Sequence, residues 1–373
     1  MADRRARWFI GLMSGTSLDG IDGVLVDVST PKCAVAQHAS APLAPELKAE
    51  LLALNTRGSD ELHRAQRAAN ALARAYAEVV QRLLTQARLP AAAIEALGAH
   101  GQTVRHQPQA LDGTGYTLQL NSPALLAELT GITVVADFRS RDVAAGGQGA
   151  PLVPAFHQSV FGVPGEPVAV LNLGGMANLS LLHADGSVSG FDCGPGNVLI
   201  DHWCQRHTGR PWDADGAWAA SGKVLPVLLQ ELLAEPYFAL APPKSTGRDL
   251  FHPRWLLQHL ARHADARAED VQATLSELTA QVCAADLLRH APTTRALIVC
   301  GGGAYNRHLM ARLQARLPAC EVQTSARHGL PPEQVEAAAF AWLAWRCIER
   351  LPGNLPAVTG ARGARVLGAI YPA

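Results

Sequence analysis

Residues 8–28 read WFIGLMSGTSLDGIDGVLVDV, and this stretch carries the strongest local signal for the fold. Its two apolar runs, Trp8–Met13 and Ile21–Val28, flank the turn sequence Gly15–Gly20. Strand, tight turn and strand is the simplest interpretation. The turn offers two glycines, two hydroxyls and a carboxylate, and glycine lets a phosphate approach backbone N–H groups closely. The pattern predicts a phosphate-binding turn or an ordinary hairpin turn, and by itself it favours neither.

The same layout recurs in the middle of the chain. Val168–Leu173 and Ala177–Leu182 are apolar runs separated by Gly174-Gly175. A third glycine turn, Gly301–Gly303, follows the apolar run Arg295–Cys300. This repetition of pattern, without repetition of sequence, indicates two halves built on one plan. Two related domains, each with a phosphate turn and with the third turn under an adenosine, would fit it.

The length of the chain supports a division into two domains. At 373 residues it exceeds what one hydrophobic core comfortably holds. The pattern restarts near the Pro- and Gly-rich residues 164–167. We therefore expect an N-terminal domain at 1–165 and a C-terminal domain at 166–350, with the tail 351–373 a candidate for packing on the first.

Composition and charge narrow the class of protein. Lys plus Arg and Asp plus Glu both number 32, so no net field favours nucleic acid or an acidic membrane surface. No stretch approaches the ~20 apolar residues that span a bilayer, and the apolar run after the basic start is too short for a signal peptide. The seven cysteines form no Cys-x-x-Cys pair. We expect a cytoplasmic protein with no protein-built metal site and with neither nucleic-acid nor membrane partners.

Two common nucleotide motifs are absent. Residues 216–224 approximate a Walker A sequence, but they have one residue too many between the glycines and no Ser or Thr after Lys223. They also fall beside or within an expected helix, Trp218–Glu235. Gly301–Asn306 does not match Gly-x-Gly-x-x-Gly, so a dinucleotide fold is not expected.

Asp192 lies in the sharpest local motif, Phe191–Asn197, which reads FDCGPGN. The turn precedes an expected helix from Val198, so the carboxylate would lie at a strand end near helix N–H groups. An Asp placed there can act as a general base. A helix-capping carboxylate explains the same residues.

Three other polar segments are candidates for ligand contacts. The segment Asp137–Asp142 has two arginines beside two acids, at the start of an expected loop over Arg139–Gln148. The arginines could bind a carboxylate or phosphate of a ligand, or they could form ion pairs at the surface. The segment His100–Thr103 follows an expected buried strand. This position is typical of a ligand-binding turn, and also of an ordinary capped turn. Lys244–Arg248 suits a phosphate-contacting loop or an ordinary solvated one.

Taken together, these segments resemble the anhydro-N-acetylmuramic acid kinase family. The resemblance covers essentially the whole chain, and its matching stretches are residues 11–20, 100–103, 135–139, 142–157, 172–175 with Asn178, 191–197, 244–248, 300–303, 351–354, 358–360 and 367–369.

The resemblance implies an α/β fold of two RNase H-like domains, as in the actin-like ATPases, around a central nucleotide and substrate cleft. It implies that water opens the ring of 1,6-anhydro-N-acetylmuramic acid at C1 while O6 takes the γ-phosphoryl group of ATP, with Mg²⁺ neutralising phosphate charge. The product would be N-acetylmuramic acid 6-phosphate, in cell-wall sugar recycling. The family also suggests a homodimer.

The resemblance further implies roles for individual residues. Asp192 would be the general base. The nucleotide would contact Gly15, Thr16, Ser17, Leu18, Asp19, Gly20, Ile21, Asp22, Gly174, Gly175, Asn178, Gly301, Gly302 and Gly303. The sugar would contact His100, Gln102, Asp137, Arg139 and Glu336, although Glu336, on the last expected helix, could equally be a surface or ion-paired residue. An actin-like kinase for another sugar or carboxylate, and a non-catalytic ATP-binding sensor, are the alternatives.

Overall fold

The computed structural model describes residues 6–15, 18, 20–30, 32–110, 112–247 and 250–373. It divides into two compact units, one formed by residues 1–161 and 334–373 and the other by residues 162–333. The first boundary lies close to the expected one. The second differs, because residues 334–350 belong to the first unit and not to the C-terminal domain in which the sequence pattern placed them.

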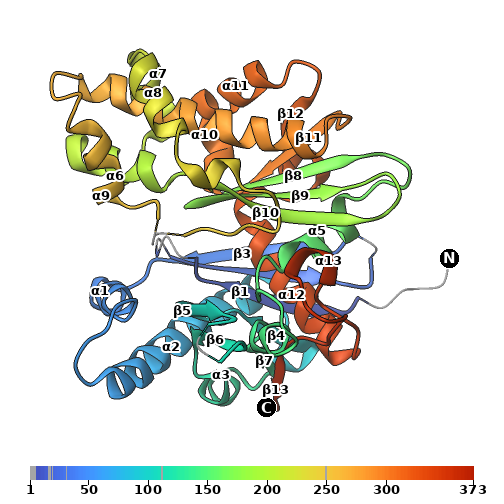
Figure 1. Cartoon of the computed structure of the whole chain (residues 1–373). Coiled ribbons are helices and arrows are strands. Elements are labelled where there is room, and N and C mark those ends of the chain that lie inside the picture. Colours follow the sequence, from blue (N-terminus) through green and yellow to red (C-terminus); the bar gives the residue numbers. More distant parts are fainter. Residues whose placement is uncertain (1–5, 16–17, 19, 31, 111, 248–249) are drawn as a thin grey trace. The chain divides into compact units, whose positions relative to one another are not determined.

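The first unit is built on a six-stranded sheet in the order β13-β7-β4-β1-β2-β3 (Figure 1). β1, β2 and β3 are antiparallel neighbours, whereas β1, β4 and β7 run parallel. A separate two-stranded sheet pairs β5 with β6. The strands are β1 (Trp8–Met13), β2 (Ile21–Asp27), β3 (Ala34–Ala41), β4 (Ile94–Ala99), β5 (Gln102–Pro108), β6 (Gly115–Leu120), β7 (Val134–Ala136) and β13 (Ala369–Tyr371).

Helices cover both faces of this sheet. A Cβ atom at Gly23 would meet Val79 of α2, whereas one at Gly11 would lie 1.8 Å from the carbonyl oxygen of Ala337 in α12. The missing side chains at Gly11 and Gly98 therefore let α12 lie directly against β1 and β4. The helices of this unit are α1 (Pro45–Ala53), α2 (Glu61–Ala87), α3 (Pro123–Thr130), α4 (Ser140–Ala144), α5 (Val153–Phe161), α12 (Val335–Ile348) and α13 (Pro356–Thr359).

The second unit repeats the plan of the first. Its sheet has the order β10-β9-β8-β11-β12, with β8, β9 and β10 antiparallel and β8, β11 and β12 parallel. This matches β3-β2-β1-β4-β7 strand for strand, which is the RNase H-like arrangement. The predicted fold class of two such domains is confirmed. The strands are β8 (Val168–Leu173), β9 (Met176–Leu182), β10 (Val188–Pro195), β11 (Ala296–Cys300) and β12 (Glu321–Thr324).

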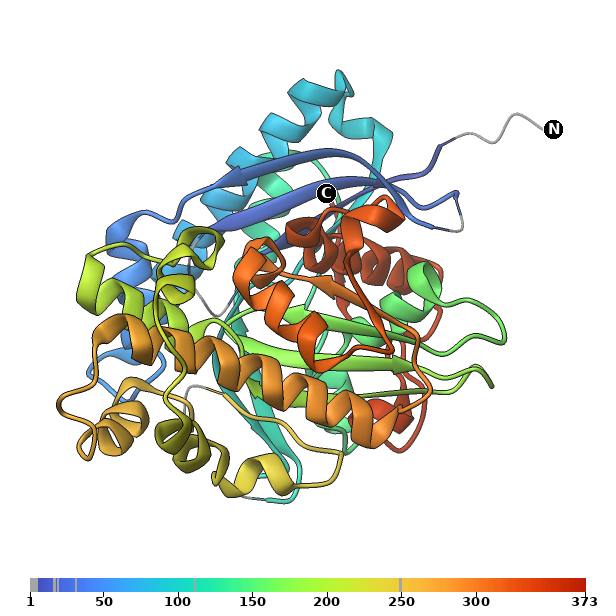
Figure 2. The ribbon, with the colours of Figure 1, turned by 90° about the horizontal axis from the view of Figure 1, so that it is seen from above.

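The long helix α10 packs along one face of the second sheet (Figure 2). The single helix expected over Trp218–Glu235 is wrong, because α7 ends at Ser221, just before Gly222, and α8 begins only at Pro226. The loop expected over Arg139–Gln148 contains the short helix α4. The helices of this unit are α6 (Val198–Thr208), α7 (Ala217–Ser221), α8 (Pro226–Leu233), α9 (Pro253–Leu260), α10 (Ala268–His290) and α11 (Arg307–Arg316).

Candidate active site

The turn between β1 and β2 is described in part. Thr16, Ser17 and Asp19 lie outside the described residues. The N–H of Leu18 donates to the carbonyl oxygen of Gly15 at 3.1 Å, which closes a tight turn. Leu18 has φ of 56° and is buried, so its apolar side chain anchors a conformation that few non-glycine residues adopt.

Asp22 stands where this turn enters β2. Its Oδ1 lies 3.2 Å from Nε2 of His38, and 40% of its side chain is exposed. Mg²⁺ prefers carboxylate oxygens and keeps several waters. An accessible carboxylate at the end of a glycine-rich turn fits that requirement, so Asp22 could hold the ion directly or through water.

The turn is joined to the end of β4 through Ser14. The hydroxyl of Ser14 donates to the carbonyl oxygen of Gly101 at 3.2 Å and lies 3.0 Å from the hydroxyl of Tyr76. Burial raises the pKa of Tyr76 to about 12, so the phenol remains a neutral hydrogen-bonding group. The start of the Gly15–Gly20 turn and the His100–Gln102 segment are therefore neighbours within one unit.

His100 and Arg139 are brought together. Nε and Nη2 of Arg139 lie 3.1 and 3.0 Å from Nε2 of His100, while Nη1 donates to the carbonyl oxygen of Gly149 at 2.8 Å. Burial, and then the charge of Arg139, hold the pKa of His100 well below its usual range. The imidazole is therefore neutral and accepts at Nε2, and its contact with Arg139 orients the guanidinium group.

The remaining substrate candidates of this unit have different surroundings. Asp137 is exposed, has φ of 57° and accepts a hydrogen bond from the hydroxyl of Ser140. Gln102 is 2% exposed at the start of β5. Glu336 lies in the first turn of α12 and is partly buried. Asp142, the second acid of the Asp137–Asp142 segment, is fully buried. It accepts hydrogen bonds from Gly149, Asn354 and Thr359, and the last two connect the segment to the C-terminal tail.

Asp192 lies on β10 in the second unit and is half-buried. Its Oδ2 accepts a hydrogen bond from the backbone N–H of Thr246 at 3.0 Å. Its own N–H donates to the carbonyl oxygen of Lys244, and its carbonyl oxygen accepts from the hydroxyl of Tyr237 at 2.7 Å. Hydrogen bonds therefore hold one carboxylate oxygen and both backbone polar groups of Asp192.

A row of polar side chains crosses the sheet beside Asp192. Asp192 is opposite Asn178 on β9, Asn178 is opposite Asn172 on β8, and Asn172 is opposite Cys300 on β11. Residues directly opposite one another project from the same face of a sheet. Their strand neighbours, such as Leu171, Leu179 and Phe191, belong to the apolar core that includes α10, so the polar row lies on the other face. Asn172, which was not among the expected site residues, lies in this row opposite Asn178. An Asn inside an apolar strand was the signal that could have singled it out.

Lys244 contradicts the expectation of a phosphate-contacting or solvated loop. Its Nζ lies 2.9 Å from Oδ2 of Asp286 on α10, and the two side chains are only 1% and 4% exposed. The lysine therefore serves to anchor the Lys244–Thr246 segment. Arg248, at the other end of the motif, lies outside the described residues.

The glycine turns of the second unit pack on one another. The carbonyl oxygens of Gly174 and Gly175 accept hydrogen bonds from N–H groups at the start of α6, including those of Gly196 and Asn197. A Cβ at Gly303 would contact the Asn197 side chain, and one at Gly301 would lie 2.4 Å from Oδ1 of Asn172. A Cβ at Gly302, by contrast, would meet no heavy atom within 4 Å. The predicted nucleotide residues of this unit thus form one cluster with an open side at Gly302.

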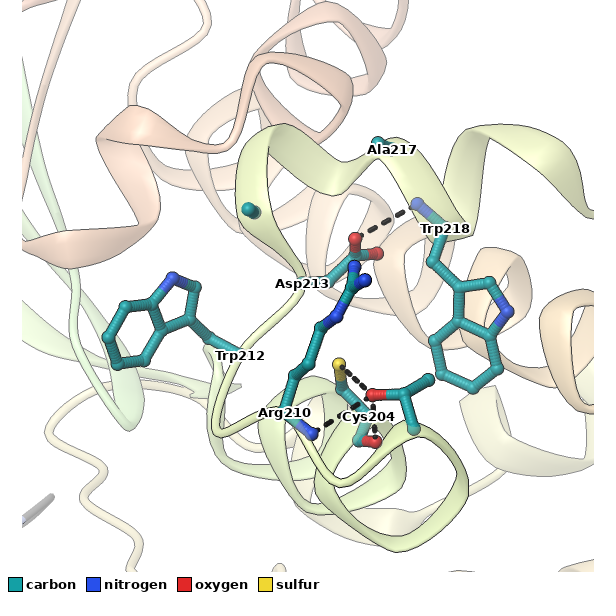
Figure 3. Close-up of a pocket in the computed structure, with 8 residues that line it drawn as sticks. Cys204, Arg210, Trp212, Asp213, Ala217 and Trp218 are labelled. Carbon is teal, nitrogen blue, oxygen red and sulfur yellow. Dashed lines mark hydrogen bonds between the residues drawn. The ribbon is translucent and has the colours of Figure 1, made fainter.

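A separate hollow of about 240 Å³ was not predicted from the sequence (Figure 3). It lies between α6 and α7 and is lined by residues that include Arg210, Trp212 and Trp218. Oδ1 of Asp213 accepts the backbone N–H of Trp218 at 2.9 Å and Oδ2 accepts that of Ala219. This carboxylate caps α7, so its role in the hollow is structural.

Among the helices of the described residues, none combines the length and apolar character needed to cross a membrane. Within the same part of the chain, no three His, Cys, Asp or Glu side chains gather as metal ligands.

Comparisons with known proteins identify relatives over almost the full length. The family model described as "Anhydro-N-acetylmuramic acid kinase" matches residues 7–373. Three curated proteins of that name are similar to this chain. The one from Variovorax paradoxus is 65% identical and the alignment covers 98% of this chain and 99% of the relative. Those from Albidiferax ferrireducens and Cupriavidus metallidurans are 61% and 58% identical, with 98% of this chain and 99% and 97% of the relatives covered.

Proposed function

Because this chain belongs to the anhydro-N-acetylmuramic acid kinase family, we propose that it opens the ring of 1,6-anhydro-N-acetylmuramic acid and phosphorylates O6 with ATP. The products are N-acetylmuramic acid 6-phosphate and ADP, and the reaction serves the recycling of cell-wall sugars. The reaction belongs in the cytoplasm, where ATP is available. The family precedent also leads us to propose a homodimer, which light scattering after gel filtration tests.

The position of Asp192 is the observation that carries the mechanism. A general base must be held in one orientation, and the N–H of Thr246 holds one of its carboxylate oxygens at 3.0 Å. Asp192 takes a proton from water, and the water oxygen bonds to C1 as the C1–O6 bond breaks. O6 leaves with the electron pair and attacks the γ-phosphorus, and ADP departs. Ring opening therefore creates the nucleophile, and no second base is needed for a sugar hydroxyl.

The nucleotide is assigned to the glycine turns. Gly15–Asp22 in the first unit and Gly174, Gly175, Asn178 and Gly301–Gly303 in the second are the proposed contacts. The open side of Gly302 supports this assignment, since it leaves the backbone free for close approach. Mg²⁺, bound with ATP and held with help from Asp22 and Asp19, supplies neutralisation of phosphate charge.

The sugar is assigned to the His100–Gln102 segment with Asp137, Arg139 and Glu336. The fixed guanidinium of Arg139 offers a cation for the lactyl carboxylate, because its contacts with His100 and Gly149 set its direction. Neutral His100 supports Arg139 without adding a competing charge. These assignments keep the acidic group of the sugar on the first unit.

The test is release of ADP by the purified protein with Mg-ATP and 1,6-anhydro-N-acetylmuramic acid in ¹⁸O-labelled water. We expect sugar-dependent ADP and label at C1 of a 6-phosphorylated product. The label must be read promptly, because the opened anomeric centre exchanges oxygen with water. ATP binding without stimulation by this sugar would overturn the assignment of the substrate, and turnover without solvent label would overturn hydrolytic ring opening.

A further inference from the structure

The backbone of β10 is irregular at the proposed base. Asp192 is opposite Asn178 on β9, whereas Gly194, two residues later, is opposite Ala177. Cys193 is therefore an extra residue, and the strand has a β-bulge at this point. A bulge changes the direction in which neighbouring side chains point, because the ladder of hydrogen bonds is disrupted there. The direction of the Asp192 carboxylate thus depends on contacts outside the sheet.

The position of β10 in the sheet supplies those contacts. Among the described strands it is the last one beside β9, so its outer edge carries backbone groups that a neighbouring strand would otherwise bind. At Asp192 two other segments do this instead. The N–H of Asp192 donates to the carbonyl oxygen of Lys244 at 3.1 Å, and its carbonyl oxygen accepts from the hydroxyl of Tyr237 at 2.7 Å. Only the second of these bonds is made by a side chain, so a substitution can remove it and leave the backbone unchanged.

Tyr237 is itself fixed in place. It lies in the short 3₁₀ helix η3 (Pro236–Ala239), and its N–H donates to one carboxylate oxygen of Glu235. The other oxygen of Glu235 accepts from the indole N–H of Trp255 at 2.9 Å. Tyr237 is 7% exposed, and its ring packs edge-on against that of Phe251. The hydroxyl is therefore held in one position relative to β10.

Tyr237 contacts the bulge from the side of the apolar core. Its ring belongs to the core that includes α10, whereas the polar row of Asp192 lies on the other face of the sheet. Phe238, the next residue, packs on the same stretch of β10, because a Cβ at Gly194 would lie 2.6 Å from its ring. Tyr237 is thus placed to support the base without occupying the face on which the polar row lies.

We infer that Tyr237 is a positioning residue for the proposed base. Its hydroxyl fixes the peptide group between Asp192 and Cys193, and thereby the direction of the Asp192 carboxylate. The inference rests on the proposed function and adds a residue to its mechanism. A general base acts when its oxygen lies within hydrogen-bond reach of the proton, and a displacement of about 1 Å can cost about 100-fold in rate. Loss of the hydroxyl therefore slows the chemical step and leaves the binding of ATP and sugar largely unchanged.

The test compares Tyr237→Phe with the wild type and with Leu313→Val. Tyr237→Phe removes the hydroxyl and keeps the ring that packs in the core. We expect it to lower kcat with 1,6-anhydro-N-acetylmuramic acid about 10-fold, with KM for the sugar and for ATP within about 3-fold of the wild type. Leu313→Val changes a fully buried residue of α11 in the same core. It should lower Tm at least as much as Tyr237→Phe does, and leave kcat within about 3-fold.

Thermal unfolding, with all assays well below each Tm, separates positioning from general stability. An unchanged kcat for Tyr237→Phe, or a rise in KM alone, would overturn the assignment. So would an equal loss of kcat in Leu313→Val, or a Tyr237→Phe protein that no longer binds ATP in titration calorimetry, because either result makes the hydroxyl a requirement of the fold alone. Absence of turnover by the wild type would overturn the proposed function and this inference together.

Discussion

Nζ of Lys244 lies 2.9 Å from Oδ2 of Asp286, and the pair is buried on the α10 side of the second sheet. The ammonium group also lies 5.5 Å from the ring centre of Phe191 and 5.2 Å from that of Tyr237. Lys244 accepts the N–H of Asp192 through its carbonyl oxygen. The pair thus anchors the segment that holds the proposed base, although neither charge lies on the same face as that base.

Lys244→Met is expected to lower the free energy of unfolding by about 3–5 kcal/mol, because it leaves Asp286 charged, buried and unpaired. The double variant Lys244→Met with Asp286→Leu should recover much of the loss. Urea unfolding of the full chain measures both. Arg307→Met, which breaks the exposed pair with Asp215, is the control and should change little. A stability of Lys244→Met equal to that of the wild type would show that the pair does not anchor the segment.

Asp192→Asn is expected to abolish ring opening and sugar-dependent ADP formation, with kcat lowered about 10²- to 10⁴-fold or more. The affinity for ATP should remain nearly intact, because the change is almost isosteric. ADP release and ATP titration calorimetry give the two quantities. Asp185→Asn, on an exposed turn of the same unit, is the matched control. Substantial turnover by Asp192→Asn would remove this residue from the role of base.

The glycines of the third turn should separate into structural and ligand-facing positions. Gly301→Ala should destabilise the second unit, because φ is 79° and the new Cβ would lie 2.4 Å from Asn172. Gly302→Ala should fold normally and weaken ATP binding, because its side is open. Thermal unfolding and ATP titration of both variants check this. If Gly302→Ala binds ATP as the wild type does, the open side does not face the nucleotide.

Burial lowers the pKa of His157 to about 3. Part of the loss of stability at low pH should therefore come from this residue. The unfolded chain takes up this proton near pH 6.5, and the folded protein does so only near pH 3. Between these values the unfolded state binds more protons, so stability declines as the pH falls, by about 1.4 kcal/mol per pH unit. Urea unfolding between pH 6.5 and 4 should show a shallower dependence for His157→Leu. Parallel curves would contradict this.

Local patterns predicted much of the fold because apolar runs and glycine turns act over a few residues. The strand Trp8–Met13 and the strand Val168–Leu173 were predicted at their observed bounds. The sequence pattern did not predict that α12 belongs to the first unit. That placement depends on the close approach of Gly11 and Ala337, which are far apart in the chain.

The site was predicted less completely for the same reason. Asp192 was singled out by its turn, but its row with Asn178 and Asn172 depends on strand register. Lys244 fitted a phosphate-contacting or a solvated loop, because its burial with Asp286 cannot be detected in the local sequence.

The placement of α12 against β1 has a consequence for biosynthesis. The second unit is a continuous segment, whereas the first is completed only by residues 334–373. A ribosome therefore delivers every residue of the second unit before the helix that covers β1 and β4 exists. Until then one face of the first sheet lacks its covering helix. The nascent chain must keep this apolar surface from aggregating while about half of the protein is still being made.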